Sequence, residues 1–219
     1  MKKRYKILRN AVSKELCDFL KNYFLEKEQI ARLYFSTEFI SQFNKEYGVF
    51  NDEQVPGSYA IYGSMAGDMI LTKVKSLVEK NLKKKLYETY SYVRVYKQGD
   101  TLHRHKDRPS CQISTTVNLG GDEWPIYLDP TGQSSVLGGN ETSTVVKSNP
   151  NKGIKVVLRP GDGLVYSGCD LEHWREPFDG LECSQVFLHY NNLDGDFKDK
   201  NSFDNRPMLG LPSSFKGGN

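Results

Sequence analysis

The chain has 219 residues, of which 37% are hydrophobic and 12% aromatic, and its formal net charge at pH 7 is +3. This length and composition are sufficient for one domain, residues 1–219, with a sizeable core. The charge is far below the concentrated positive field of a dedicated nucleic-acid-binding protein, so nucleic acid is unsupported as a partner. The chain has no apolar run of the roughly 18 residues that a membrane span needs. The N-terminal sequence MKKRYKILRNAV lacks the apolar segment of a signal peptide, so we expect a soluble, cytoplasmic protein.

The first part of the chain, residues 1–87, is expected to form helical support for the rest. Ser13 is a suitable N-cap for a first helix. Apolar residues recur after it at helical spacing: Leu16, Phe19, Leu20, Tyr23 and Phe24. Residues 68–86 carry a second broad apolar stripe and predict a second helix with lysines on its outer side. Between the helices, residues 37–59 are rich in turn-forming types and predict a loop, either a lid or a simple connection.

From about residue 88 the pattern changes to short strands separated by turns, which is typical of a sandwich or barrel. The expected strands are 90–97, 101–107, 112–119, 124–128, 143–147, 154–158, 163–167, 171–176 and 183–191. Residues 130–142 and 148–153 are expected to be loops, and residues 194–219 a tail that runs over the surface and ends disordered. The predicted fold class is mainly β with helical support (α+β), with the strand-rich core at 88–193 and the N-terminal helices packed on one sheet.

Two strands joined by a turn at residues 97–100 contain the most informative side chains of the chain. Strand alternation directs His105 and Asp107 to the same side, two positions apart. An imidazole and a carboxylate so placed can bind one face of a metal ion, and a third ligand completes the 2-His-1-carboxylate set that suits non-haem Fe(II). The chain has only four histidines, and His173, in a strand-rich region well downstream, is the expected third ligand.

This ordered set of motifs resembles the Fe(II)/2-oxoglutarate-dependent oxygenases, and within them the prolyl 4-hydroxylase-like branch. Its elements are Tyr96-x-x-Gly99, His105-Lys106-Asp107, the strand CQISTTVNLGG, the segment GDGLVYSG and the distal His173. A lone HxD occurs by chance, but these elements follow one another in the order of the branch. The resemblance implies a double-stranded β-helix, or jelly roll.

The resemblance also implies an enzyme in which His105, Asp107 and His173 bind Fe(II) at the catalytic centre. 2-Oxoglutarate is then the cosubstrate, decarboxylated to succinate by O2 while a substrate C–H bond is hydroxylated, with ascorbate as a reductant. The branch implies a peptidyl or free proline, so the expected partner is a peptide or a small molecule. The same mechanism on a small metabolite or an alkylated nucleic-acid base stays open, as does a non-catalytic, cupin-like metal-binding module. Nothing in the sequence indicates an oligomeric state.

The 2-oxoglutarate anchor is the point where this chain departs from the branch. Relatives carry Arg or Lys shortly after the distal histidine, commonly as Gly-x-Arg/Lys, and the corresponding residues here end in Glu182. A carboxylate cannot pair with a carboxylate, so we expect Glu182 to pair with a surface cation. Arg175 lies two strand positions after His173, on the same side, and is the expected substitute. Arg94 is the second choice because it shares a face with Tyr96, which hydrogen-bonds the oxo acid in relatives.

Three polar residues alternate along one strand face after the HxD motif: Ser114, Thr116 and Asn118. Asn118 stands where prolyl hydroxylases often have a tyrosine, which places the three among the candidate cofactor-binding residues. Strand packing with outward polar side chains is the alternative reading.

The two other histidines have different expectations. In a regular strand His103 points to the same face as His105. A cupin-like metal site that uses these two histidines as its pair therefore stays open. The glutamate that usually follows such a pair is absent, since Pro109 and Ser110 occupy its place. His189 lies on an apolar strand and is expected to be structural.

Overall fold

The computed structural model describes residues 4–139, 144–147, 151–197 and 200–215. Two α-helices lie in this part of the chain, α1 (Lys14–Ser36) and α2 (Met65–Leu82). The strands are β1 (Tyr5–Leu8), β2 (Tyr59–Tyr62), β3 (Leu86–Lys97), β4 (Leu102–His105), β5 (Ile113–Gly121), β6 (Ile126–Leu128), β7 (Ser135–Gly139), β8 (Thr144–Lys147), β9 (Ile154–Val156), β10 (Gly163–Ser167), β11 (His173–Arg175) and β12 (Glu182–Asn192). Two short helical segments are η1 (Pro109–Cys111) and η2 (Ser202–Asn205).

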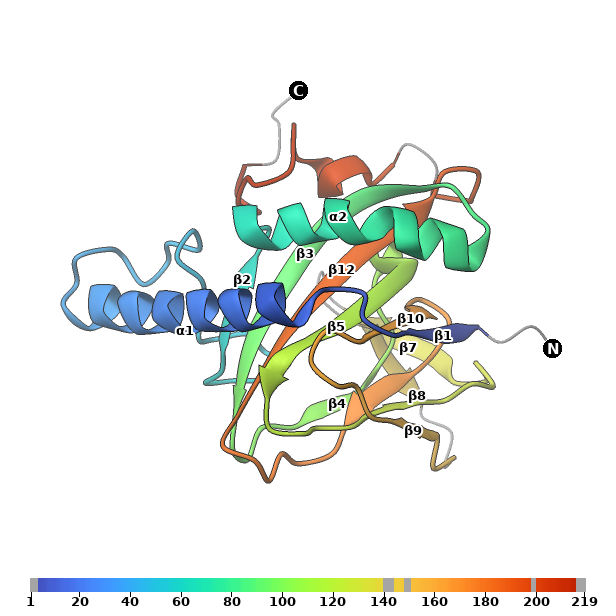
Figure 1. Ribbon diagram of the computed structural model, residues 1–219, viewed down its shortest axis with the longest axis horizontal. Helices are drawn as coiled ribbons and strands as arrows, with labels where there is room; N and C mark the ends of the chain where they lie inside the picture. The colour runs from blue at the N-terminus through green and yellow to red at the C-terminus, as the bar shows by residue number, and fades with distance from the viewer. Residues whose placement is uncertain (1–3, 140–143, 148–150, 198–199, 216–219) are drawn as a thin grey trace.

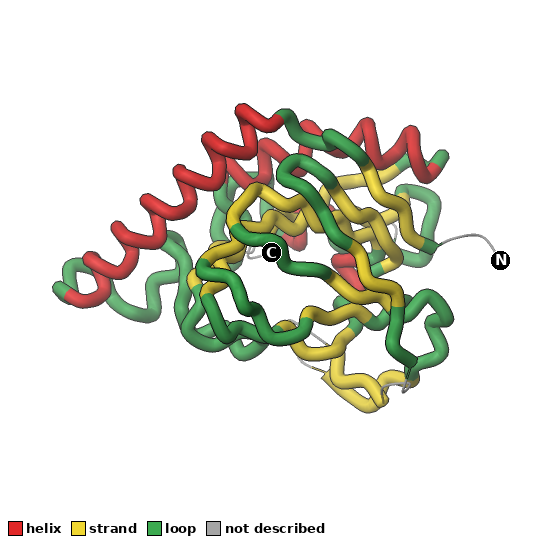
Figure 2. Tube along the Cα trace, turned by 60° about the horizontal axis from the view of Figure 1, so that its bottom comes forward, coloured by secondary structure: helices red, strands yellow, loops and turns green. Residues whose placement is uncertain are grey.

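Two antiparallel sheets form the body of the fold. The major sheet has the strand order β1-β10-β5-β12-β3-β2, and the minor sheet has the order β4-β11-β6-β9. β7 and β8 pair separately as a hairpin. Figure 2 shows the strands (yellow) gathered on one side of the two helices (red). This arrangement confirms the predicted mainly β, jelly-roll architecture.

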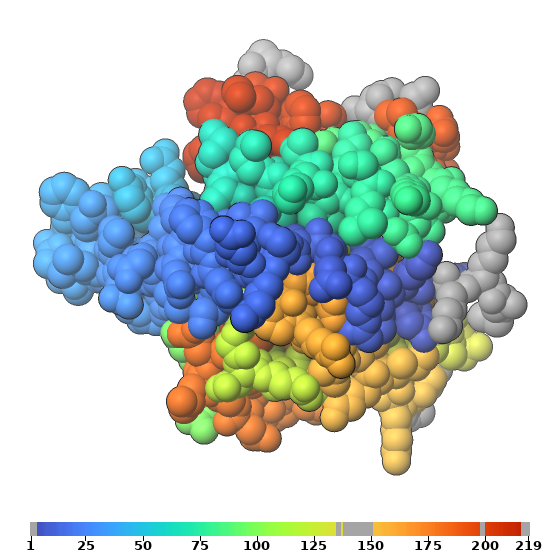
Figure 3. Space-filling view, viewed as in Figure 1, coloured from blue at the N-terminus to red at the C-terminus, as the bar shows by residue number. Residues whose placement is uncertain are grey.

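Both helices cover the outer face of the major sheet (Figures 1 and 3), where α2 contacts β3 and β12 and α1 contacts β5. The alternation along β3 explains why one face is apolar: Val93 and Val95 belong to the core under the helices. Tyr96, which points the other way, packs in a separate cluster with Trp124 and Phe178. The predicted packing of the N-terminal helices on one sheet is therefore confirmed. Neither described helix combines the length and apolar composition needed to cross a membrane.

Ser13 is the N-cap of α1, as predicted. Its backbone is extended (φ −65°, ψ 151°), and its side chain accepts a hydrogen bond from the Leu16 amide at 3.4 Å. Ser13→Ala is expected to lower the free energy of unfolding by about 1 kcal/mol, because one first-turn N–H loses its acceptor. Denaturant unfolding followed by circular dichroism measures the change. Ser76→Ala, at an exposed position inside α2, is the matched control, and an equal loss in both variants would contradict the capping role.

Three strands were not expected from the sequence. β1 and β2 lie within the region predicted as helices and loop, and they extend the major sheet at its two edges. β7 lies within the predicted loop 130–142, so that prediction was wrong for Ser135–Gly139. Its Ser- and Gly-rich sequence is typical of turns, but pairing with β8 overrides this weak preference. Residues 130–134 of the predicted loop are turn or irregular, as expected, and its last positions, 140–142, lie outside the described residues, as do 143 and 148–150.

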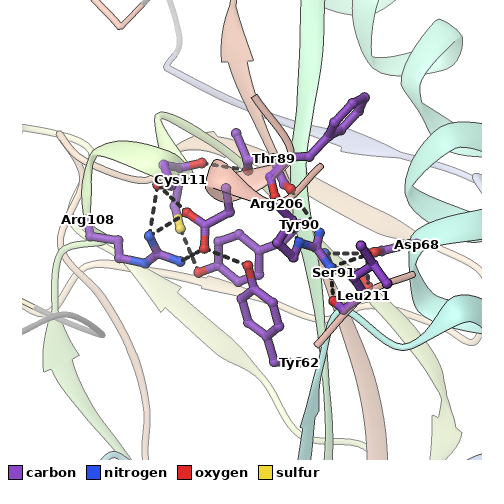
Figure 4. A network of polar contacts seen from close by, with 12 residues as sticks. Tyr62, Asp68, Thr89, Tyr90, Ser91, Arg108, Cys111, Arg206 and Leu211 are labelled. Atoms are coloured by element: carbon purple, nitrogen blue, oxygen red, sulfur yellow. Dashed lines mark hydrogen bonds and ion pairs between the residues drawn. The ribbon is translucent and has the colours of Figure 1, made fainter. Parts of the chain in front are cut away.

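The segment after β12 also differs from the prediction of a surface tail. Asp204 and Arg206 are only 1% and 3% exposed. The Arg206 guanidinium donates to the buried Asp68 carboxylate of α2 at 3.1 Å, which ties the segment to the major-sheet side of the molecule (Figure 4). The surface prediction was therefore wrong for this stretch. The predicted disordered end, residues 216–219, lies outside the described residues.

Candidate metal centre

The three predicted ligands converge. His105 ends β4, His173 begins β11, and the two are direct cross-strand partners. Asp107, just beyond β4, places Oδ1 3.7 Å from His105 Nε2 and 3.5 Å from His173 Nε2. One ligand atom from each residue lies within 4.8 Å of the other two. This separation allows all three to bind a single metal ion from one side.

Hydrogen bonds on the far side of each ligand fix its orientation. The Nδ1 atoms of His105 and His173 lie 2.8 and 3.0 Å from the carbonyl oxygens of His103 and Leu171. A carbonyl accepts only, so Nδ1 carries the proton in both rings and Nε2 presents its lone pair to the centre. This outer arrangement is the one found around metal-binding histidines.

The pKa shifts of Asp107, His105 and His173 also suit a set of metal ligands. Burial raises the pKa of Asp107, but His173 and other neighbours lower it more, so the net pKa lies well below its usual range. Burial and then His173 lower the pKa of His105 to about 4. Burial alone would lower the pKa of His173, but the Asp107 carboxylate raises it above its ordinary value. The site thus offers one carboxylate and two imidazoles that a cation can take up in their neutral forms, which suits a divalent first-row metal.

His103 does not join the metal site. β11 and β4 pair with a register shift, since His173 lies opposite His105 whereas Arg175 lies opposite Leu102. Such a bulge re-aims side chains and breaks the simple alternation on which a shared phase depends. His103 is exposed, and neither metal-type cluster found among the described residues includes it. The geometry therefore gives no support to the cupin-like pair.

Ser114 supports the carboxylate ligand. Its hydroxyl donates to Asp107 Oδ2 at 2.6 Å and lies 3.0 Å from His189 Nδ1. Ser114→Ala is expected to weaken metal binding about 10- to 100-fold, because an outer hydrogen bond that orients a ligand is lost. Titration calorimetry with Mn2+ measures the affinity. His103→Ala is the control with no expected effect, and a large loss there with none in Ser114→Ala would reverse the assignment.

A cavity of about 830 Å3 opens beside the three ligands. Arg94 and Tyr96 line it, as predicted for residues near a bound oxo acid. Thr116 lies beside the Tyr166 hydroxyl, which is itself at the cavity wall. Asn118 uses both ends of its amide inside the sheet: Nδ2 donates to the Leu158 carbonyl at 2.8 Å, and Oδ1 accepts from the Gly120 amide at 2.9 Å. These contacts match strand packing, the alternative reading for Asn118, and its place among the cofactor-binding residues stays a prediction.

Arg175 is buried among groups that do not satisfy it. It is 1% exposed, and its guanidinium lies 4.9 Å from the centre of the Trp124 ring and donates one bond to the Trp124 carbonyl. Its Nε and Nη2 have no hydrogen-bond partner among the described residues, and the Tyr96 hydroxyl lies nearby. Unpaired buried donors are costly unless a ligand or water completes them. This corner of the interior is therefore suited to an anionic group.

Relatives commonly carry Gly-x-Arg/Lys shortly after the distal histidine, and this chain has Glu182 in place of the base. The register of β12 against β3 shows which residue of this chain faces the interior at that place. On β12, Cys183 lies opposite Tyr96 and Glu182 lies opposite Lys97. Cys183 is fully buried on the inner face, whereas the Glu182 carboxylate lies 3.4 Å from the Lys97 ammonium, confirming its pairing with a surface cation. The Arg175 charge acts on Cys183, so the two side chains are neighbours. A small thiol at this position leaves room for the arginine of the minor sheet.

Comparisons with protein-family models and with curated proteins find no match for this chain. Solved structures do match. A prolyl-4-hydroxylase from Pseudomonas putida gives a TM-score of 0.56 at 12% identity, over 87% of this chain and 93% of that one. HygX from Streptomyces hygroscopicus, with nickel, 2-oxoglutarate and hygromycin B bound, gives 0.59 at 12% identity, over 98% and 90%. EctD from S. alaskensis gives 0.60 at 14% identity, over 96% and 80%. This chain therefore shares the fold of these proteins, one of which was solved with nickel and 2-oxoglutarate bound.

Other residues of the cavity wall were not singled out from the sequence, although the segment around Asp52 belongs to the predicted loop 37–59, for which a lid was one of two readings. His189 has the structural contacts expected of it, packing on the Tyr90 ring at 4.6 Å, yet it also lines the cavity. Two distant segments, around Asp52 and around Asp204, complete the wall. No motif marks these segments, because their role depends on contacts made only in the folded chain.

Proposed function

We propose that the protein is an Fe(II)- and 2-oxoglutarate-dependent oxygenase that hydroxylates a substrate C–H bond. The observation that carries this proposal is the convergence of His105, Asp107 and His173 beside a cavity with unpaired buried donors. When bound, iron would supply the activation of O2 and the oxidation of the oxo acid. The protein contributes orientation of the ligands through the His103 and Leu171 carbonyls and through Ser114.

Arg175 is the proposed anchor for the far carboxylate of 2-oxoglutarate. Its unpaired Nε and Nη2 and the Tyr96 hydroxyl can all donate to one carboxylate, and a guanidinium–carboxylate pair is strong in a buried site. Arg94 lines the cavity and also has an unpaired Nε, but its Nη2 already lies 2.7 Å from the Asp52 carboxylate, so less of its guanidinium is free for a ligand. The geometry therefore favours the first of the two arginines that the sequence singles out.

Proline, peptidyl or free, is the substrate that the motif resemblance favours, and one of the matching solved structures is a prolyl-4-hydroxylase. Another match was solved with hygromycin B bound, so the shared fold also accommodates other substrates. A small metabolite or an alkylated base stays as the alternative. We also propose a cytoplasmic location, where reducing conditions would keep iron as Fe(II) and the four free cysteines as thiols.

The test is 2-oxoglutarate turnover by purified protein that has been stripped with a chelator and reconstituted with Fe(II) and ascorbate. We expect O2-dependent release of succinate, and no release after chelation or in His173→Ala. A prolyl peptide, free L-proline, an alkylated oligonucleotide and a set of small metabolites are then compared for stimulation of succinate release. Protein that binds Fe(II) but neither binds nor consumes 2-oxoglutarate would be a metal-binding module instead.

A further inference from the structure

Two segments far apart in the chain form the outer wall of the cavity. The first strap, residues 49–54, precedes β2, and the second strap, residues 201–213, follows β12. The cavity-lining residues of the straps are Val49, Asn51, Asp52, Glu53 and Gln54 from the first and Asn201, Asp204, Asn205 and Ser213 from the second. The substrate space is therefore bounded by these straps as well as by the barrel.

The first strap is held by an aspartate. Asp52 pairs with the Arg94 guanidinium at 2.7 Å and accepts a hydrogen bond from the Tyr92 hydroxyl. The Arg94 side chain is 2% exposed, so this ion pair is buried. Val49 adds a backbone bridge to Ala60 on β2. Lifting this strap would leave a buried guanidinium without its partner, which is strongly unfavourable.

The second strap is held by a corresponding aspartate, Asp204, and Figure 4 shows two of its partners, Arg108 and Tyr62, pointing toward the same place. Asp204 accepts two hydrogen bonds from the Arg108 guanidinium, at 2.7 and 2.8 Å, and one each from the Tyr62 and Ser110 hydroxyls, at 2.6 and 2.7 Å. Two residues on, Arg206 pairs with Asp68 at 3.1 Å, and the two side chains are 0% and 1% exposed.

The backbone of the second strap is strained at the same place. Phe203, Asp204 and Asn205 have φ values of 48°, 56° and 65°. Consecutive non-glycine residues in the left-handed region are unfavourable and persist only where surrounding contacts hold them. The Asp204 and Arg206 contacts supply that restraint. The strap is therefore held in this conformation by specific contacts with the rest of the fold.

The two aspartate clusters are neighbours. Tyr62 on β2 and Tyr92 on β3 are direct cross-strand partners, and each hydroxyl donates to the aspartate of one strap. The straps are thus fastened side by side at the β2 edge of the major sheet, and both line the cavity that contains the candidate metal ligands of the minor-sheet side. Each strap is held by an ion pair with a buried partner, so neither strap lifts readily to admit an extended polymer.

The charges of the outer cavity cancel. Apart from the metal-ligand residues and His189, the charged side chains among the described lining are three cations and three carboxylates: Lys45, Arg94, Arg108, Asp52, Glu53 and Asp204. Two of the arginines are paired with two of the aspartates. Uncharged hydrogen-bonding groups complete the straps: Asn51, Gln54, Asn201, Asn205 and Ser213. A phosphate backbone would find no excess positive charge here.

We infer that the substrate is a free small molecule with no net charge and several hydrogen-bonding groups, enclosed between the two straps. This inference rests on the proposed oxygenase function and selects one substrate class within it. The cavity volume of about 830 Å3 lies in the range of small-molecule sites. A zwitterionic amino acid such as free proline and an uncharged polyol share this chemistry. A residue within a polypeptide and a base within a nucleic acid do not.

The first experiment compares four probes with the Fe(II)-loaded protein: free L-proline, a set of uncharged glycosides, an acetylated prolyl peptide and a single-stranded oligonucleotide. Stimulation of succinate release by either free probe, and by neither polymer, is expected, and the responding probe separates the zwitterion from the polyol. Greater stimulation by the peptide or oligonucleotide overturns the inference but leaves the oxygenase function standing. Turnover of 2-oxoglutarate that none of the four probes stimulates also counts against the inferred substrate class. Absence of 2-oxoglutarate binding and turnover is the separate failure of the oxygenase function.

The second experiment tests the wall itself. Asp204→Asn is expected to raise the half-saturating concentration of the stimulating probe about tenfold, the size of one lost charge-assisted hydrogen bond. Calorimetry with Mn2+ and 2-oxoglutarate should show unchanged binding of both. Asp194→Asn, at an exposed site ten residues earlier, is the control without effect. Tyr62→Phe, which removes one hydroxyl from the Asp204 cluster, is the milder second variant. Unchanged half-saturation in both test variants would overturn the role of the second strap.

Discussion

Asp107→Ala is expected to abolish metal-dependent turnover and to leave a folded protein. Asp107 supplies the one carboxylate of the candidate centre, with Oδ1 within 3.7 Å of Nε2 of both histidines. Its loss leaves two neutral imidazoles, and the effect on metal affinity should exceed the roughly 10- to 100-fold that follows loss of an outer hydrogen bond. Mn2+ titration and succinate release measure the two losses.

The variant should stay folded, because both imidazoles can become neutral once the carboxylate is gone, so that no buried charge is left without a partner. Circular dichroism and thermal unfolding of metal-free protein check this point. Asp129→Ala removes another buried carboxylate of the barrel. It is the control for any loss of stability that follows removal of a buried carboxylate in general. Asp107→Ala protein that still binds Mn2+ with unaltered affinity would show that the metal centre lies elsewhere.

Arg175→Met is expected to raise the apparent KM for 2-oxoglutarate about 10- to 100-fold, equivalent to ~1.5–3 kcal/mol for a hydrogen bond to a charged group. The Arg175 guanidinium is buried with its Nε and Nη2 unpaired, so in the free protein it has the most to gain from an incoming carboxylate. Metal affinity should change little, because this side chain extends away from the ligand set toward Trp124 and Cys183. Initial rates at varied 2-oxoglutarate concentration give the KM.

Two further variants make this result specific. Arg175→Lys keeps the charge but loses the two-pronged geometry, and an intermediate KM is expected. Arg94→Met tests the second arginine, whose guanidinium is already paired with Asp52. An unaltered KM in Arg175→Met with a raised KM in Arg94→Met would transfer the anchor to β3. A complex in which hydroxyl groups alone hold the far carboxylate would contradict both assignments.

Local pattern was enough to predict both helices, most of the strands and the candidate ligands. Helical spacing after Ser13 placed α1, and turn residues with short alternating runs placed most of the strands between β3 and β12. His105, Asp107 and His173 could be singled out because the chain has only four histidines and a motif with its own order. Helical spacing and strand alternation involve only a few consecutive residues, and the small number of histidines is a matter of composition. Both can therefore be read directly from the sequence.

Tertiary structure decided how these parts act together. The bulge between β4 and β11 turns His103 outward although it shares a strand phase with His105, and no local signal announces a register shift. Cys183, rather than Glu182, faces Tyr96 because of how β12 pairs with β3.

The cavity wall depends on contacts over still longer separations. Asp204 is 96 residues from Arg108 in the chain, and Asp52 is 40 residues from Tyr92. Each pairing is favourable only after the barrel has brought the partners together and excluded water from them, because exposed pairs of the same types contribute little. The residue types in a sequence show which charges exist, but only the packed chain decides which of them become buried partners and which stay free for a ligand.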